Sequence, residues 1–89
     1  MFQMYSGETK QVKLRFHKKL ANAVIDRFGK DLIFMPEPDG EHFIFNVEVT
    51  LSPMFYSWII GFGDKAAILS PQNAVDGCKA LCQEVMALY

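Results

Sequence analysis

The spacing of apolar residues changes from a strand period to a helix period early in the chain, and this change restricts the possible folds most strongly. Residues 11–17 alternate strictly, with Val12, Leu14 and Phe16 on one face and basic residues on the other, the pattern of a half-buried strand. After this strand the apolar residues recur every three or four positions, and Gly29 stands where a left-handed residue ends a helix. The chain therefore begins with a strand followed by an amphipathic helix.

A hairpin is predicted next. Residues 31–35 form a short apolar run, residues 36–40 read Pro-Glu-Pro-Asp-Gly, and residues 41–50 alternate again with apolar side chains on one face. A turn sequence between two such runs is typical of a hairpin, although this connection is longer than the tightest turns.

Two further helices are expected from their start signals. Ser52 and Pro53 supply a side-chain cap and a proline at the first helical position, and Ser70 and Pro71 repeat this pair after a brief strand at residues 66–69. The first of these helices is apolar around nearly its whole circumference, so we expect it to be buried on more than one side. The second carries one apolar stripe to the end of the chain.

The resulting order is strand, helix, strand, strand, helix, strand, helix, which contains the split βαβ pattern of ferredoxin-like folds. The predicted fold class is thus α+β, with one antiparallel β-α-β-β-α-β sheet and an added C-terminal helix. Right-handed connections place the first two helices on the same face of the sheet. We expect the last helix, or a partner, to cover the other face.

The 89 residues fit one domain. We place this domain at residues 11–89 and interpret residues 1–10, which are polar and contain a glycine after an apolar start, as a linker. The apolar residues Phe2, Met4 and Tyr5 form a candidate interface with a neighbouring domain or subunit; a tail folded back onto its own domain explains them equally well.

Charge and cysteine content exclude several classes of protein. Nine basic and ten acidic residues give a net charge of -1, so no overall field attracts the chain to nucleic acid or to an anionic membrane. No apolar run approaches the roughly 18 to 20 residues that span a bilayer. Two cysteines are too few for a disulfide framework, which favours a reducing, cytoplasmic setting.

No enzyme is expected. The chain contains no nucleophile elbow and no glycine-rich phosphate loop, and Gly61 and Gly63 are explained more simply as a helix end and a turn. Acylphosphatases share the ferredoxin-like fold, but their anion loop would fall at residues 17–20, where no glycine occurs. We predict no catalytic residue and no cofactor.

A metal site is not expected either. Cys78 and Cys82 share a helix face and offer two thiolates, whereas tetrahedral zinc needs four ligands. We interpret both as packing residues, and His17 and His42 as solvated surface residues.

Basic residues supply the candidate contacts to an effector. Lys13 and Arg15 lie on the outer face of the predicted sheet, and Lys19 and Arg27 share a face of the first helix. All four are candidate contacts to nucleic acid or another anionic effector. A cross-strand ion pair between Arg15 and Glu48 is the simpler explanation for Arg15, and a solvated helix surface is the simpler explanation for Lys19 and Arg27. The outer face lacks the stacking aromatics of an RNA-recognition sheet.

Several stretches taken in order resemble a known family. They are Met4-Tyr5-Ser6-Gly7-Glu8, Val24-Ile25-Asp26-Arg27-Phe28-Gly29, Ser52-Pro53-Met54-Phe55-Tyr56-Ser57-Trp58, Gly61-Phe62-Gly63-Asp64, Ile68-Leu69-Ser70-Pro71 and the terminal Tyr89. Together they resemble the C-terminal extension (WCX) domain that follows the WYL domain in bacterial WYL-type transcriptional regulators, also described as DeoR-like or helix-turn-helix type 11 proteins. The resemblance runs from about Phe2 to Tyr89.

The resemblance implies a parent protein with a winged helix-turn-helix that binds DNA, a WYL domain, and this domain in a regulatory role. It also implies a homodimer and an effector such as single-stranded DNA or a nucleotide. Our leading hypothesis is a non-enzymatic regulatory and dimerisation domain in transcription regulation. The alternative is an ACT-like sensor that binds an amino acid or a nucleotide at a subunit interface.

Overall fold

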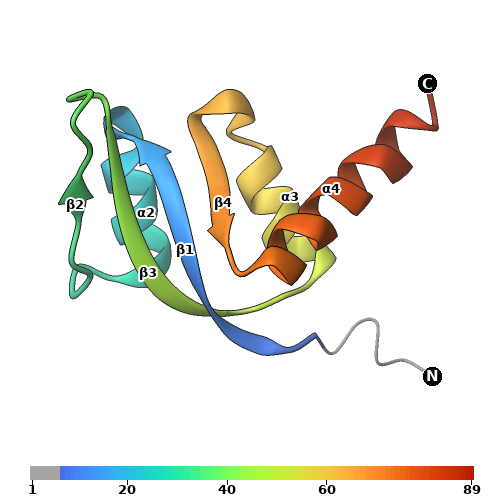
Figure 1. Cartoon of the computed structure of the whole chain (residues 1–89), viewed down its shortest axis with the longest axis horizontal. Coiled ribbons are helices and arrows are strands. Elements are labelled where there is room, and N and C mark those ends of the chain that lie inside the picture. Colours follow the sequence, from blue (N-terminus) through green and yellow to red (C-terminus); the bar gives the residue numbers. More distant parts are fainter. Residues whose placement is uncertain (1–6) are drawn as a thin grey trace.

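The computed structural model describes residues 7–89. Its elements follow the predicted order (Figure 1). They are β1 (Thr9–His17), η1 (Lys18–Leu20), α2 (Ala21–Phe28), β2 (Met35–Pro36), β3 (His42–Thr50), α3 (Pro53–Ile60), η2 (Gly63–Lys65), β4 (Ala66–Ser70) and α4 (Gln72–Met86).

The four strands form one antiparallel sheet in the order β2-β3-β1-β4. This arrangement is consistent with a ferredoxin-like fold, so the predicted α+β class is confirmed. The two long central strands pair over their whole length, from Thr9 opposite Thr50 to His17 opposite His42. β1 begins two residues before the predicted start, because Thr9 and Lys10 extend the pairing with β3.

The core lies between the sheet and the helices. Alternation along β1 and β3 turns one set of side chains inward, as predicted, and Phe16 and Phe45 at its centre are completely buried, with ring centroids 5.5 Å apart. The buried apolar residues are Val12, Leu14, Phe16, Val24, Phe43, Phe45, Leu51, Phe55, Ile59, Ile68 and Ala74. Every strand except the short β2, and each α-helix, contributes to this core.

The first helical segment begins with a tight turn. Residues 18–20 form a 3-10 turn whose start is capped by the His17 ring, which accepts a hydrogen bond from the backbone N–H of Lys19 at 3.1 Å. The helix proper runs over α2 and ends at Gly29, which adopts a φ of 88° and donates its N–H to the Ile25 carbonyl at 2.7 Å. The predicted glycine ending is present, although its ψ of 173° is extended rather than left-handed helical.

α3 begins as predicted. The Ser52 hydroxyl accepts a hydrogen bond from the backbone N–H of Phe55 at 3.2 Å, and Pro53 occupies the first turn. The expectation that α3 is buried on more than one side is confirmed, since the helix packs against both β4 and α4, but it is not buried all round. Phe55 and Ile59 face the sheet, whereas Met54 is 79% exposed and Ile60 is also solvent-accessible, because nothing in the described chain covers the far side of the helix.

The start of α4 differs from its prediction. Ser70 remains in β4, where it pairs with Lys13, so its side chain does not cap the helix. Pro71 is instead the N-cap residue, and its carbonyl accepts hydrogen bonds from the N–H groups of Ala74 and Val75. The following helix starts at Gln72.

α4 packs against α3 and β4 and then extends away from the body of the domain (Figure 1). The expectation that this helix covers the outer face of the sheet is therefore wrong. It lengthens the helical layer beyond the β4 edge instead, since its apolar stripe meets α3. Within residues 7–89, no helix is long and apolar enough to cross a membrane.

Candidate functional site

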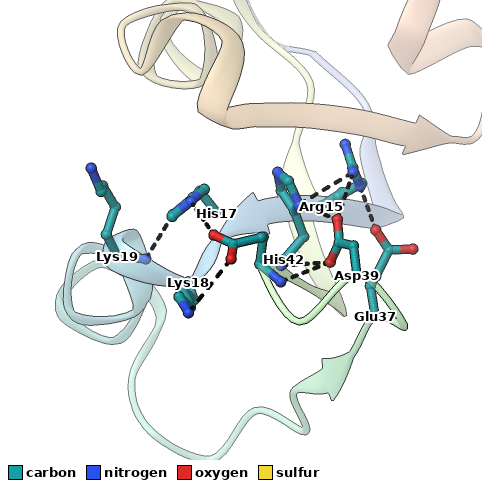
Figure 2. Close-up of polar contacts among 8 residues, drawn as sticks. Arg15, His17, Lys18, Lys19, Glu37, Asp39 and His42 are labelled. Atoms are coloured by element: carbon teal, nitrogen blue, oxygen red, sulfur yellow. Dashed lines mark hydrogen bonds and ion pairs between the residues drawn. The ribbon is translucent and has the colours of Figure 1, made fainter.

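Six polar side chains gather at one end of the sheet, where β1 ends and the turn from β2 enters β3 (Figure 2). We call this the strand-end cluster. Its members are Arg15, His17, Glu37, Asp39, Glu41 and His42. They come together because β1 and β3 are antiparallel, which places the last residue of β1 opposite the first of β3.

Arg15 lies at the centre of the cluster. Its Nε donates a hydrogen bond to Glu37 Oε1 at 2.5 Å, and its Nη2 lies 3.6 Å from Asp39 Oδ2. The predicted alternative, an ion pair with Glu48, is wrong, because the register places Ile44 opposite Arg15 and Gln11 opposite Glu48. Arg15 thus fastens the turn to β1 through two carboxylates.

Asp39 organises the turn itself. Its carboxylate accepts hydrogen bonds from the backbone N–H groups of Glu41 at 2.8 Å and His42 at 3.1 Å, and lies 2.7 Å from His42 Nδ1. The hydrogen bond from Glu41, followed by those from His42, lowers the pKa of Asp39 to about 2. An ionised carboxylate only accepts, so His42 Nδ1 carries the proton that it donates to Asp39.

The two histidines are fixed rather than solvated. His17 Nδ1 accepts the Lys19 N–H, so in the neutral ring Nε2 carries the proton and faces Glu41 Oε1 at 3.3 Å. The side chains of His17 and His42 are only 20% and 19% exposed, and their rings meet edge to face with centroids 5.3 Å apart. The prediction of two solvated surface histidines is therefore wrong. The antiparallel register of β1 and β3 places His17 opposite His42, and that register could have predicted that the two rings meet.

Three members of the cluster have donor atoms within 4.8 Å of one another, as a metal site requires: Glu37, Asp39 and His42. The Arg15 guanidinium, however, lies against all three, with Nη2 also 3.3 Å from His42 Nδ1. The positive charge of the Arg15 guanidinium thus lies where a metal ion would bind. The arrangement fits a structural ion-pair network better than a metal centre.

The predicted effector contacts are divided between two parts of the domain. Lys13 and Arg15 project from the outer face of β1, because their neighbours Val12, Leu14 and Phe16 are buried on the other face. Lys19 lies in η1, and Arg27 lies on α2 with its guanidinium 5.0 Å from the Trp58 ring. The predicted interface residues Phe2, Met4 and Tyr5 fall outside the described part of the chain.

These basic residues differ in their availability. Arg15 is engaged by the strand-end cluster, and Arg27 stacks on an aromatic ring. Lys13 and Lys19 are exposed and make no ion pair within residues 7–89.

A second surface feature is apolar. The distal half of α4 carries large exposed side chains, and the groove between it and α3 has a volume of about 360 Å³. We call this the α3–α4 surface and define it by Ile60, Leu81, Val85, Met86, Leu88 and Tyr89. The sequence predicted the α4 stripe and assigned this helix to the core and to an interface, but a stripe does not reveal which of its residues remain uncovered.

Comparison with known families identifies one match. Residues 8–86 match the WCX domain. A search of curated proteins found no match. The matched region runs from just before β1 to the end of α4. The sequence resemblance is thereby confirmed, and the chain belongs to the WCX domain family, the regulatory domains of WYL-type transcriptional regulators.

Proposed function

We propose that this domain is a non-catalytic regulatory and dimerisation domain of a WYL-type bacterial regulator that acts in the cytoplasm. In its parent chain, the residues before β1 link it to a preceding WYL domain, and a winged helix-turn-helix precedes that; Thr9 and Lys10, which were predicted to lie in the linker, belong to β1. Membership of the WCX family supports the regulatory role. The uncovered α3–α4 surface supports the dimerisation role.

The argument for dimerisation starts from exposure. Met86 is 70% exposed and lines the groove beside Ile60, and Leu88, two residues further along the chain, is 78% exposed. Contiguous exposed apolar surface is typical of interaction sites. The projecting apolar end of α4 lies beside an apolar groove, so one copy offers both halves of an apolar contact. In the proposed two-fold dimer, the α4 end of each copy packs into the groove of the other.

Sedimentation of the chain over micromolar concentrations tests this interface. We expect a concentration-dependent dimer, and we expect Val85→Lys to shift it to monomer because a charge enters the apolar contact. Gln83→Lys is the matched control, since it adds the same charge on the same turn of α4 outside the α3–α4 surface. A strictly monomeric wild-type chain, or equal loss in both variants, contradicts the proposal.

The proposed regulatory input is an anionic effector, single-stranded DNA or a nucleotide, with Lys13, Arg15, Lys19 and Arg27 as candidate contacts. Lys13 and Lys19 are the better contacts, because their ammonium groups have no internal partner among the described residues. Each phosphate that such a cation neutralises makes binding more sensitive to salt.

Titration with labelled single-stranded DNA at several salt concentrations tests the effector contacts. Lys13→Glu and Lys19→Glu should weaken binding and reduce its salt dependence, whereas Lys30→Glu, an exposed control outside the predicted set, should change it less. Absence of binding at low salt contradicts the effector proposal. Unchanged affinity in the first two variants contradicts the choice of residues.

A further inference from the structure

Cys78 and Cys82 lie one helical turn apart on α4, and both line a groove bounded by α3, β4 and α4. This groove has a volume of about 340 Å³ and apolar walls that include Ile59, Ile68 and Val75. Residues four apart on a helix are neighbours on one face. The two thiols therefore open onto one mostly apolar groove, where Cys78 is partly buried and Cys82 is exposed.

The thiols also interact with each other. Burial, followed by the nearby Cys82, raises the pKa of Cys78. Both cysteines are free. Both sulfur atoms are therefore available as soft ligands.

We propose that Cys78 and Cys82 form a binding site for one soft monovalent metal ion, Cu(I), held between their two sulfur atoms. Thiolate ligands select Cu(I), zinc and iron–sulfur clusters over harder ions. Zinc needs two more ligands, and no histidine or carboxylate lines this groove among the described residues. Cu(I) needs only the two sulfurs.

The charge balance of the complex is favourable. Each thiol releases one proton to solvent as its sulfur–copper bond forms, and copper enters and stays as Cu(I), so no electron is transferred. The bis-thiolate complex carries one negative charge. Lys79, a residue of opposite charge, lines the same groove.

The proton release gives the site a pH signature. Because each thiol must lose its proton when its sulfur binds the metal, the apparent affinity for Cu(I) rises with pH. An ion held only by surface carboxylates or by the Met86 thioether lacks this dependence in the same range.

Anaerobic competition with a coloured Cu(I) chelator tests the site, with the reduced 89-residue chain and Cu(I) alone as the probe. We expect one ion per chain, near-ultraviolet thiolate-to-copper absorption, and affinity that increases between pH 6 and pH 8. Cys78→Ser and Cys82→Ser should each weaken binding by on the order of 100-fold, about 2.7 kcal/mol. Met86→Leu, one turn further along α4, should leave it unchanged.

Circular dichroism of each variant separates loss of the site from loss of the fold. Folded serine variants that bind Cu(I) as tightly as the wild type overturn the proposal, as does an equal loss in Met86→Leu. Zinc binding as tight as Cu(I) binding overturns the assignment to Cu(I). One ion shared by two chains overturns the intrachain site.

Discussion

The ring of Tyr56 on α3 lies against Gly77 of α4, in the space that a Cβ atom at position 77 would occupy. Such a Cβ would lie 2.6 Å from Tyr56 Cζ and 2.9 Å from Cε2, closer than real carbon contacts. A glycine inside a helix usually costs stability. Here it permits α3 and α4 to approach closely, and burial against α4 raises the pKa of the Tyr56 hydroxyl.

Gly77→Ala should destabilise the domain by about 1 to 3 kcal/mol, because the added methyl group overpacks the contact with Tyr56. At an uncrowded position in a helix, the same substitution stabilises by about 0.5 to 1 kcal/mol. The sign of the change in unfolding free energy therefore shows whether Tyr56 crowds position 77. Chemical unfolding measures the effect. The double variant with Tyr56→Leu should recover part of the loss, and a Gly77→Ala variant more stable than the wild type contradicts the packing argument.

Phe45→Ala should cost about 3 to 5 kcal/mol of unfolding free energy, because it removes a large buried ring from the centre of the core. Phe45 is fully buried and contacts the rings of Phe16, Phe28, Phe34 and Phe43. Ile33→Ala is the surface control, since Ile33 is 79% exposed, and should change stability by less than about 0.5 kcal/mol. Urea unfolding of the wild type and of both variants measures these differences in unfolding free energy.

Arg27→Gln should cost about 0.5 to 1 kcal/mol, because it removes a cation positioned over an aromatic face. The guanidinium carbon lies 5.0 Å from the Trp58 ring centroid and 6.0 Å from that of Phe28. Trp58 is the only tryptophan, so its fluorescence should change in the folded variant. Lys30→Gln removes a nearby exposed charge and should leave both stability and fluorescence close to wild type.

Asp39 should make the domain less stable in acid. Its folded pKa of about 2 lies below the ordinary value of 3.8, so its contribution is fully present above about pH 4 and is lost as the pH falls toward 2. Asp39→Ala should therefore lower the melting temperature at pH 7, with a difference from wild type that shrinks between pH 4 and pH 2.

Asp39→Asn separates the contribution of the backbone hydrogen bonds from that of the negative charge. Its amide oxygen still accepts the backbone hydrogen bonds of the turn but lacks the negative charge. Melting temperatures of this variant should lie between those of the wild type and Asp39→Ala at pH 7. A difference from wild type that grows as the pH falls contradicts the assignment to Asp39.

The candidate site was predicted only in part, for a reason visible at β1. Alternation correctly placed Lys13 and Arg15 on the outer face, but it does not reveal which side chains reach across from a turn. Arg15 consequently pairs with Glu37 and Asp39 of the turn rather than with Glu48 of the neighbouring strand. The strand-end cluster follows from the register and the turn together.

The short β2 shows a similar limit. The apolar run at residues 31–35 predicted a longer strand, whereas only Met35 and Pro36 pair with β3. Pro36 has no N–H to donate, which suits the end of a short edge strand, and Ile33 points into solvent.

The sequence by itself determined the order of strands and helices, the inward face of each central strand and the Ser52 cap, because these depend on periodicity and on neighbours in the chain. Tertiary structure alone decided that α4 extends beyond the β4 edge, that Arg15 is neutralised by a turn, and that two cysteines line a common groove. Those features depend on which surfaces meet, and a one-dimensional pattern records only that a surface is apolar or charged.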